Sequence, residues 1–176
     1  MATCALTTGF ERYNCEAPAG GIEELYVLPY SSFTSVTVAS HEISAITSSG
    51  TWWGYELSEE VGLLETVETK NLQNNSLFYE TNCSFTLNKM DATKSNELSI
   101  LVTQRVVFIV KTVSGEYFFV GDSRGAHKAG GTNNATSGTA MGDLNGYTIN
   151  LRELSTHNPY EVQQAVIDGL TIDYNS

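Results

Sequence analysis

The feature that most constrains the fold is a strict alternation of residue types between Ser76 and Leu87. In a β-strand, successive side chains point to opposite faces, so a period of two sends one set into a core and the other into solvent. The mainly apolar set is Leu77, Tyr79, Thr81, Cys83, Phe85 and Leu87, and the mainly polar set is Ser76, Phe78, Glu80, Asn82, Ser84 and Thr86. Phe78 is the exception on the polar face. The segment is therefore predicted to be a long strand that covers a core on one side only.

Much of the remaining sequence also reads as strands, because Thr, Ser, Val, Tyr and Phe are frequent and only three prolines occur. We expect further strands at residues 25–28, 35–39, 51–57, 64–70, 106–112, 116–122 and 147–154. Ser114 and Gly115 separate two of these segments and predict a hairpin turn. The same two segments are continuously apolar over residues 106–110 and 117–120, which favours a place inside a sheet with both faces covered.

One helix is predicted over residues 90–104, where apolar positions recur at spacings of three and four. The recurring positions are Met90, Leu98 and Leu101, with the aliphatic stem of Lys94. This stripe is narrow, so the helix is expected to pack on the outside of a sheet or barrel. Asp91 or Asn88 could cap its start, since both side chains carry an acceptor for the free backbone N–H groups.

Together these elements predict a mainly β fold, a β-barrel or sandwich with one flanking α-helix and long loops. The 176 residues suit a single domain that spans the whole chain. We expect an N-terminal arm at about residues 1–24 and long exposed loops at about residues 54–68 and 126–145. The second loop is rich in glycine, which predicts that it is mobile or ordered only by a partner. Residues 159–167 fit either a short helix or an extended tail.

The charge balance excludes several classes of partner. The chain carries 9 Lys and Arg against 20 Asp and Glu, a formal net charge of -11. So few basic residues cannot form the electrostatic footprint of a nucleic-acid reader, and the acidic balance argues against anionic membrane surfaces. The longest apolar stretches have about five to eight residues, too short to span a bilayer. Residues 1–13 lack a basic segment followed by an apolar one, so we expect no secretory signal.

Three cysteines occur, at Cys4, Cys15 and Cys83. An odd number in a chain without a recognisable signal peptide favours free thiols in a reducing compartment. Pairing of Cys4 with Cys15 remains an alternative.

One short motif matches a catalytic signature. Residues 121–125, Gly-Asp-Ser-Arg-Gly, fit the G-x-S-x-G pattern, and Asp143 and His157 follow Ser123 in the order found in α/β-hydrolases. That motif requires a helix directly after the turn, whereas residues 126–131 read Ala-His-Lys-Ala-Gly-Gly. The alternating strand and helix pattern of that fold is also absent. We therefore interpret the motif as a turn after a strand, with a serine nucleophile as the weaker alternative.

Metal and phosphate sites are not indicated. His41, His127 and His157 are scattered and no Cys-x-x-Cys occurs, so no zinc site is expected. Residues 143–146 lack the later ligands of a calcium loop, and the glycine-rich stretch lacks the Gly-Lys-Ser/Thr element of a phosphate loop. We expect no catalytic residues, no cofactor and no metal.

An acidic run and a tryptophan pair have two interpretations each. Residues 54–68 hold five glutamates and no Lys or Arg, which fits a solvated loop or edge strand. The functional interpretation is a surface that must not hold polyanions, since negative walls repel phosphates. Trp52 and Trp53 are adjacent, so on a strand they face opposite sides. One is expected in the core, and the other is either half-covered or an anchor in an interface.

The order of elements resembles the tail tube proteins of long-tailed bacteriophages, which are related to injection-system tube proteins. The resemblance covers residues 76–151 and lies in residues 85–90 (Phe-Thr-Leu-Asn-Lys-Met), the helix that follows, residues 106–121, and the run Ser-Gly-Thr-Ala-Met-Gly-Asp-Leu-Asn-Gly-Tyr-Thr-Ile at residues 137–149. Residues 15–26, with Gly20-Gly21-Ile22, are also similar to phage structural proteins of this kind. None of these segments is a catalytic signature.

The resemblance implies a non-enzymatic virion protein, assembled in the host cytoplasm, whose hexameric rings stack into a tube that carries double-stranded DNA. It implies contacts with identical copies and other tail proteins, and places the lumen on barrel strands and the stacking contacts on loops and termini. On this basis we expect Glu80, Asn82, Ser84 and Thr86 to face the lumen. Contacts between subunits are expected at Trp52, Trp53, Gly130, Gly131, Asn134 and Thr136. The alternatives are another virion ring component, such as a tail terminator or neck protein, and a β-sandwich binding module.

Overall fold

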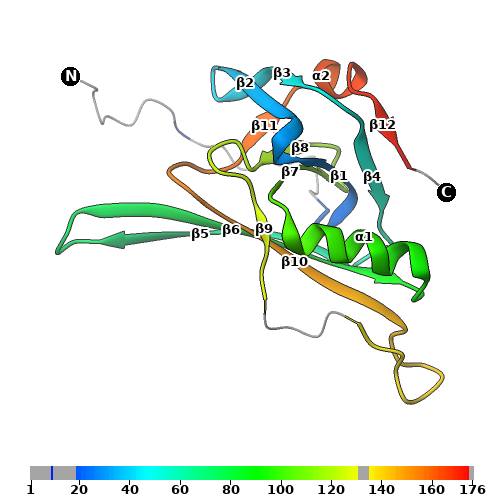
Figure 1. Ribbon diagram of the computed structural model, residues 1–176. Helices are drawn as coiled ribbons and strands as arrows, with labels where there is room; N and C mark the ends of the chain where they lie inside the picture. The colour runs from blue at the N-terminus through cyan, green and yellow to red at the C-terminus, as the bar shows by residue number, and fades with distance from the viewer. Residues whose placement is uncertain (1–8, 10–18, 131–134, 175–176) are drawn as a thin grey trace, which may run out of the picture.

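The structure is a computed structural model that describes Gly9, residues 19–130 and residues 135–174. It is mainly β, with two sheets packed as a sandwich (Figure 1). The predicted fold class is confirmed, and of its two forms the sandwich is the one observed, because the sheets do not close into a barrel.

The larger sheet, sheet A, has eight strands. Their order is β12 (Ile172–Asp173), β4 (Trp52–Glu56), β1 (Ile22–Pro29), β7 (Val106–Thr112), β8 (Tyr117–Val120), β11 (Tyr160–Val162), β3 (Glu42–Ser48) and β2 (Phe33–Ala39). The continuously apolar β7 lies inside this sheet, between β1 and β8, with residues 106–110 all buried. The predicted hairpin at Ser114 and Gly115 joins β7 to β8.

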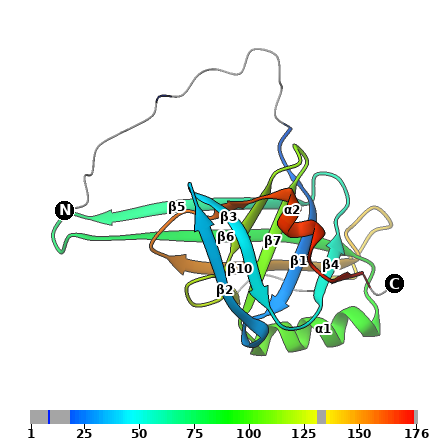
Figure 2. The ribbon, with the colours of Figure 1, turned by 90° about the horizontal axis from the view of Figure 1, so that it is seen from above.

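The smaller sheet, sheet B, contains four strands in the order β5 (Gly62–Asn71), β6 (Ser76–Asn88), β10 (Gly146–Ser155) and β9 (His127–Lys128). Every neighbouring pair is antiparallel. The alternation predicted for β6 is confirmed between Glu80 and Leu87, where buried and half-exposed side chains alternate. The other end of β6 forms a hairpin with β5 that extends beyond the body of the molecule (Figures 1 and 2).

Two apolar clusters hold the molecule together. The first lies between the sheets and includes Phe85, Phe108 and Ile149. The second lies on the other face of sheet A and includes Trp52, Ile109 and Phe119. Because Ile43 of β3 and Val162 of β11 belong to the second cluster, these strands curl back over sheet A.

The predicted helix is α1 (Ala92–Thr103), with Leu98 and Leu101 buried. Its cap is Asp91, whose carboxylate accepts a hydrogen bond from the backbone N–H of Lys94 at 2.8 Å. The undecided segment near the C-terminus contains β11 followed by a short helix, α2 (Gln164–Asp168). A 3-10 turn, η1 (Tyr30–Ser32), joins β1 to β2.

The two predicted long loops are wrong in part. Residues 54–68 are not one loop, because β4 ends at Glu56 and β5 begins at Gly62. Strand β1 begins at Ile22, close to the expected end of the N-terminal arm at about residue 24, and residues 1–8 and 10–18 of that arm lie outside the described residues. The loop expected at residues 126–145 contains β9. Strand β3 and the short strands β11 and β12 were not predicted.

Candidate functional site

No helix or strand within the described residues covers the outer face of sheet B (Figure 1). The four residues predicted to share a polar face, Glu80, Asn82, Ser84 and Thr86, do share it, and all are half-buried. The strand register places on the same face Leu63, Glu65 and Val67 of β5 and Thr148, Asn150, Arg152 and Leu154 of β10. Leu63, Val67 and Leu154 are exposed. We call this set of eleven residues the outer face.

The charges on the outer face nearly cancel. Arg152 Nη2 lies 2.7 Å from Glu80 Oε2, and Asn82 donates to Glu80 Oε1 at 3.2 Å. The hydrogen bond from Arg152 is the main reason that the pKa of Glu80 is lowered, and it raises the pKa of Arg152 in turn. Glu65 is then the one carboxylate on this face without an ion pair among the described residues. The outer face is therefore polar and close to neutral.

The two edges of sheet B carry opposite charge. Along β5 and the turn before it lie Glu59, Glu60, Glu65 and Glu68, which we call the acidic flank, while Lys70 near the end of β5 is the one cation on that strand. Lys128 lies on β9 and Arg124 in the turn before it, and Arg105, directly before β7, adjoins them because its Nη1 donates to the carbonyl of Arg124 at 2.9 Å. We call these three residues the basic flank. Within the described part of the chain, none of the seven residues of the two flanks forms an ion pair.

Trp52 and Trp53 point to opposite faces of β4, as adjacent residues on a strand do. Trp52 is 1% exposed, packs edge-on against Phe119 and donates from Nε1 to Ser48 Oγ at 3.3 Å. The expectation that Trp52 contacts another subunit is therefore wrong, because its side chain is buried in the core. Trp53 is 41% exposed and lines a groove of about 220 Å³ between β4, α1 and the C-terminal segment.

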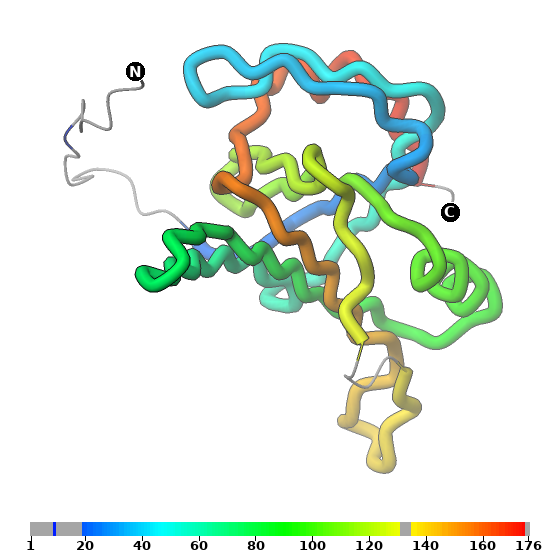
Figure 3. The backbone as a smooth tube through the Cα atoms, turned by 60° about the vertical axis from the view of Figure 1, so that its left-hand side comes forward, coloured from blue at the N-terminus to red at the C-terminus, as the bar shows by residue number. Residues whose placement is uncertain are grey.

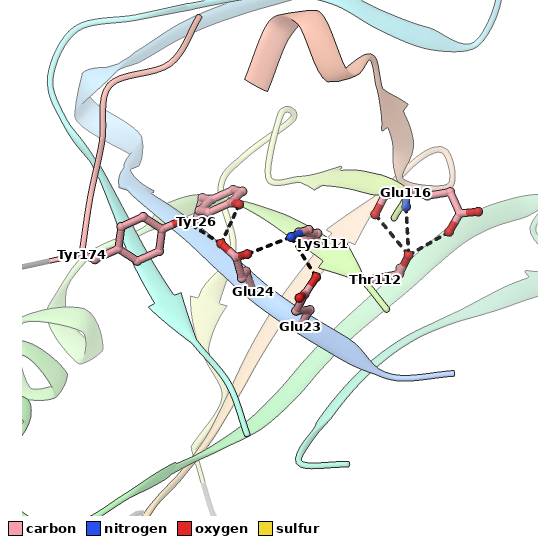
Figure 4. A network of polar contacts seen from close by, with 7 residues as sticks. All are labelled: Glu23, Glu24, Tyr26, Lys111, Thr112, Glu116 and Tyr174. Carbon is pink, nitrogen blue, oxygen red and sulfur yellow. Dashed lines mark hydrogen bonds and ion pairs between the residues drawn. The ribbon is translucent and has the colours of Figure 1, made fainter. Parts of the chain in front are cut away.

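A polar network holds the C-terminal segment beside this groove (Figure 4). Glu24 Oε2 accepts hydrogen bonds from the hydroxyls of Tyr26 at 2.8 Å and Tyr174 at 2.6 Å. Lys111 Nζ lies 2.8 Å from carboxylate oxygens of both Glu23 and Glu24. Burial raises the pKa of Glu24, but hydrogen bonds led by that of Lys111 outweigh it and the net shift is downward. The ring of Tyr174 is thereby fixed in place.

The glycine-rich segment is more ordered than its composition predicts. The backbone N–H of Thr136 donates a hydrogen bond to the carbonyl of Gly146, and the N–H of Gly146 donates one to the carbonyl of Thr136. The carboxylate oxygen Oδ2 of Asp143 accepts hydrogen bonds from the backbone N–H groups of Thr139 at 2.8 Å and Ala140 at 2.7 Å. Residues 137–145 protrude from the body (Figure 3). Gly130 and Thr136, both expected at subunit contacts, are respectively exposed and half-buried, whereas Gly131 and Asn134 lie outside the described residues.

The hydrolase residues are not assembled into a triad. His157 Nε2 lies 3.2 Å from Asp122, its Nδ1 lies 2.8 Å from the carbonyl of Asn158, and the Ser123 hydroxyl donates to Asp122 at 3.4 Å. Both imidazole nitrogens are thus engaged elsewhere, so His157 is not placed to take a proton from Ser123. Asp143 belongs to the protruding loop instead.

Sequence reasoning missed Glu153, which is 3% exposed and whose Oε2 accepts from the N–H of Gly121 at 2.9 Å. Only its place in the alternating segment 147–154 hinted that it points inward. Of the cysteines, Cys83 is a buried free thiol, and burial raises its pKa to about 12. Cys4 and Cys15, and with them their possible pairing, lie outside the described residues.

Among the described residues, no group of three or more His, Cys, Asp and Glu side chains is arranged to hold a metal ion. No helix within residues 19–130 and 135–174 is long and apolar enough to cross a membrane. The sequence matches no protein-family model, and neither a curated protein nor a solved structure shows significant similarity to it.

Proposed function

We propose that this chain is a phage tail tube subunit, a structural protein whose copies form rings, hexameric by the family resemblance, that stack into a conduit for double-stranded DNA. The observation that carries the proposal is sheet B, a four-stranded sheet with one face in the core, one polar face that no described helix or strand covers, and two edges of opposite charge.

The strand directions allow the sheet to continue from copy to copy. Sheet B has an even number of strands and every neighbour is antiparallel, so β9 runs opposite to β5. When β9 of one copy lies beside β5 of the next in the same orientation, the new pair is antiparallel as well. Such addition satisfies the free backbone groups that an edge strand otherwise leaves open to aggregation.

The charge distribution favours the same arrangement. The acidic and basic flanks lie along opposite edges of sheet B. Between two copies, like flanks therefore repel each other, and the acidic flank of one copy attracts the basic flank of the other. Two different surfaces that complement each other produce head-to-tail contacts, which close into a ring or run on as a helix.

The dimensions and the charge of the outer face suit a DNA conduit. At about 4.8 Å per strand, six copies of sheet B give a circumference of about 115 Å and a backbone diameter of about 37 Å, before any strand tilt widens it. The outer face would line this bore. Because Arg152 is neutralised by Glu80, the face offers no net positive charge that would retain phosphates.

Electron microscopy and sedimentation velocity of the purified chain test the proposal. The expected result is rings or tubes with a bore of constant width. Assembly that stops at a single ring would assign the chain to a terminator or neck role instead. A chain that stays monomeric at high concentration would refute the assembly on which the proposal depends.

A further inference from the structure

The groove beside Trp53, which we call the Trp53 groove, lies at the end of β6 that carries Leu87. It is formed by β4, the first half of α1 and the C-terminal segment, and its walls include Trp53, Tyr55, Leu87 and Tyr174. Trp53 and Tyr174 are 41% and 45% exposed, so both present open ring surface to solvent. Tyr174 is held by its hydrogen bond to Glu24 at 2.6 Å. The groove is therefore a preorganised, largely aromatic site.

Glu97 supplies the groove with a negative charge. Its carboxylate forms no hydrogen bond or ion pair with any described residue. Lys94 also lines the groove, but its ammonium group donates to the carbonyl of Asn88 at 2.6 Å and pairs with Asp91 at 3.4 Å. Asp173 already has an interaction within the chain. Glu97 is thus the lining carboxylate that an incoming cation can pair with.

A leucine projects from the opposite end of the molecule. Leu72, in the turn of the β5–β6 hairpin, is 81% exposed. The turn is ordered, because Asn71 Oδ1 accepts from the N–H of Gln73 at 2.9 Å and Asn74 Oδ1 accepts from the N–H of Ser76 at 3.2 Å. Burying this side chain against a second surface would remove apolar area from water, which is favourable.

Lys70 places a positive charge next to this turn. It is exposed, and it forms no hydrogen bond or ion pair with any described residue. The strand register sets it opposite Leu77, which is 47% exposed. The tip of the hairpin, residues 70–77, is therefore apolar and positive, which complements the aromatic walls and the carboxylate of the Trp53 groove.

Strand β6 joins the two sites. It begins at Ser76 in the hairpin tip and reaches the groove wall at Leu87, and Figures 1 and 2 show the hairpin tip and the C-terminal segment at opposite ends of the molecule. Leu77 and Leu87 are an even number of residues apart, so both belong to the core-facing side of sheet B. A second copy displaced along β6 therefore brings its hairpin tip to the groove of the first.

We propose that the Trp53 groove receives the β5–β6 hairpin tip of a second copy that follows the first end to end. Leu72 packs against the rings of Trp53 and Tyr174, and Lys70 pairs with Glu97. The contact is heterologous, because tip and groove are different surfaces at opposite ends, so it repeats from copy to copy. It rests on the proposed function in that it joins one ring to the next, whereas the edges of sheet B join copies within a ring.

Removing the leucine tests the contact. Leu72→Ser is compared with Val113→Ser, a control in the β7–β8 turn where the valine is 52% exposed. Assembly is followed by sedimentation velocity and electron microscopy, and Trp53 by acrylamide quenching, because Trp52 is already shielded in the monomer. We expect wild type and Val113→Ser to form tubes that protect Trp53. Leu72→Ser should stop at single rings, with end-to-end association weakened at least about tenfold.

Charge exchange tests the ion pair. Lys70→Glu and Glu97→Lys should each weaken end-to-end association about three- to tenfold, and the double variant should restore it. Glu161→Lys on β11 is the control for the same charge change and should assemble as wild type does. A folded double variant that fails to recover overturns the pairing.

The remaining outcomes separate this contact from the ring. If wild type forms tubes while Trp53 stays open to quencher, or if Leu72→Ser forms tubes as wild type does, the groove contact is overturned and the proposed function stands. End-to-end chains that protect Trp53 without forming rings would support the groove contact and overturn the ring. If wild type stays monomeric at every concentration, both proposals fail.

Discussion

The carboxylate of Glu153 on β10 accepts a hydrogen bond from the backbone N–H of Gly121, which directly follows β8, and so joins sheet B to sheet A inside the molecule. The other carboxylate oxygen has no hydrogen-bond partner among the described residues. Burial, and after it the charge of Asp122, raises the pKa of Glu153. A buried acid at the junction of the two sheets makes stability depend on pH.

Replacing Glu153 with Gln is expected to stabilise the chain near neutral pH. Folding raises the pKa of Glu153 above the ordinary glutamate value of 4.5. The protonated side chain therefore contributes its full share of stability below pH 4.5, and this share is lost as the pH rises through the pKa of the folded state. Glutamine keeps an acceptor for Gly121 and cannot ionise. Urea unfolding should therefore show a more stable variant at about pH 7.5 and a difference that shrinks toward about pH 4. Glu161→Gln, an exposed glutamate of β11, is the control and should show no such trend.

The two tryptophans should respond very differently to truncation. Trp52→Ala removes a fully buried ring from the cluster around Phe119, which is expected to cost about 3–5 kcal/mol of unfolding free energy. Trp53→Ala removes a partly exposed ring and should change the stability of the monomer by about 0.5 kcal/mol or less. Denaturant unfolding of both variants measures this contrast. Equal losses would mean that Trp53 supports the fold and is not a free surface residue.

The parts of the fold that sequence reasoning found are those with a local signal. The alternation in β6, the continuous apolar run of β7 and the capped spacing of α1 each arise from a few neighbouring residues. Strand β3 escaped because only Ile43 among its residues is fully buried, so its alternation is weak. The glutamates of β5 suggested a loop, although they lie on an exposed edge strand where charge is tolerated.

The site was only partly predictable for a related reason. The polar set from Glu80 to Thr86 follows from period-two geometry, but its ion partner Arg152 is far away in sequence and is brought close only by the register of β10 with β6. The contact between Glu153 and Gly121 likewise depends on how two sheets stack. Pairing across strands and sheets is not encoded in any local pattern.

Gly146 at the start of β10 is expected to tolerate no side chain. A Cβ at this position would collide with the backbone carbonyl of Leu87 on β6, and backbone atoms in a paired strand cannot rotate away. Gly146→Ala should therefore destabilise the chain by about 1–3 kcal/mol or more. Gly142→Ala, where a Cβ meets open space, is the matched control and should stay close to wild type. Equal urea midpoints for the two variants would contradict the close approach of β10 to β6.

The outer face should gain affinity for DNA when its charge balance is reversed. Glu80→Lys replaces the partner of Arg152 and places two uncompensated positive charges side by side on each subunit. The pair is half-exposed, so its loss should cost only about 0–1 kcal/mol in stability and leave assembly intact.

Assembled wild-type particles should not retain duplex DNA. Assembled Glu80→Lys particles should bind it, with an affinity that falls steeply as the salt concentration rises, because each neutralised phosphate releases counterions. Retention is measured by co-sedimentation over a series of salt concentrations. Glu161→Lys is the control, since it adds the same charge on β11, outside sheet B. If both variants retain DNA equally, the effect comes from net charge alone and the outer face does not line the bore.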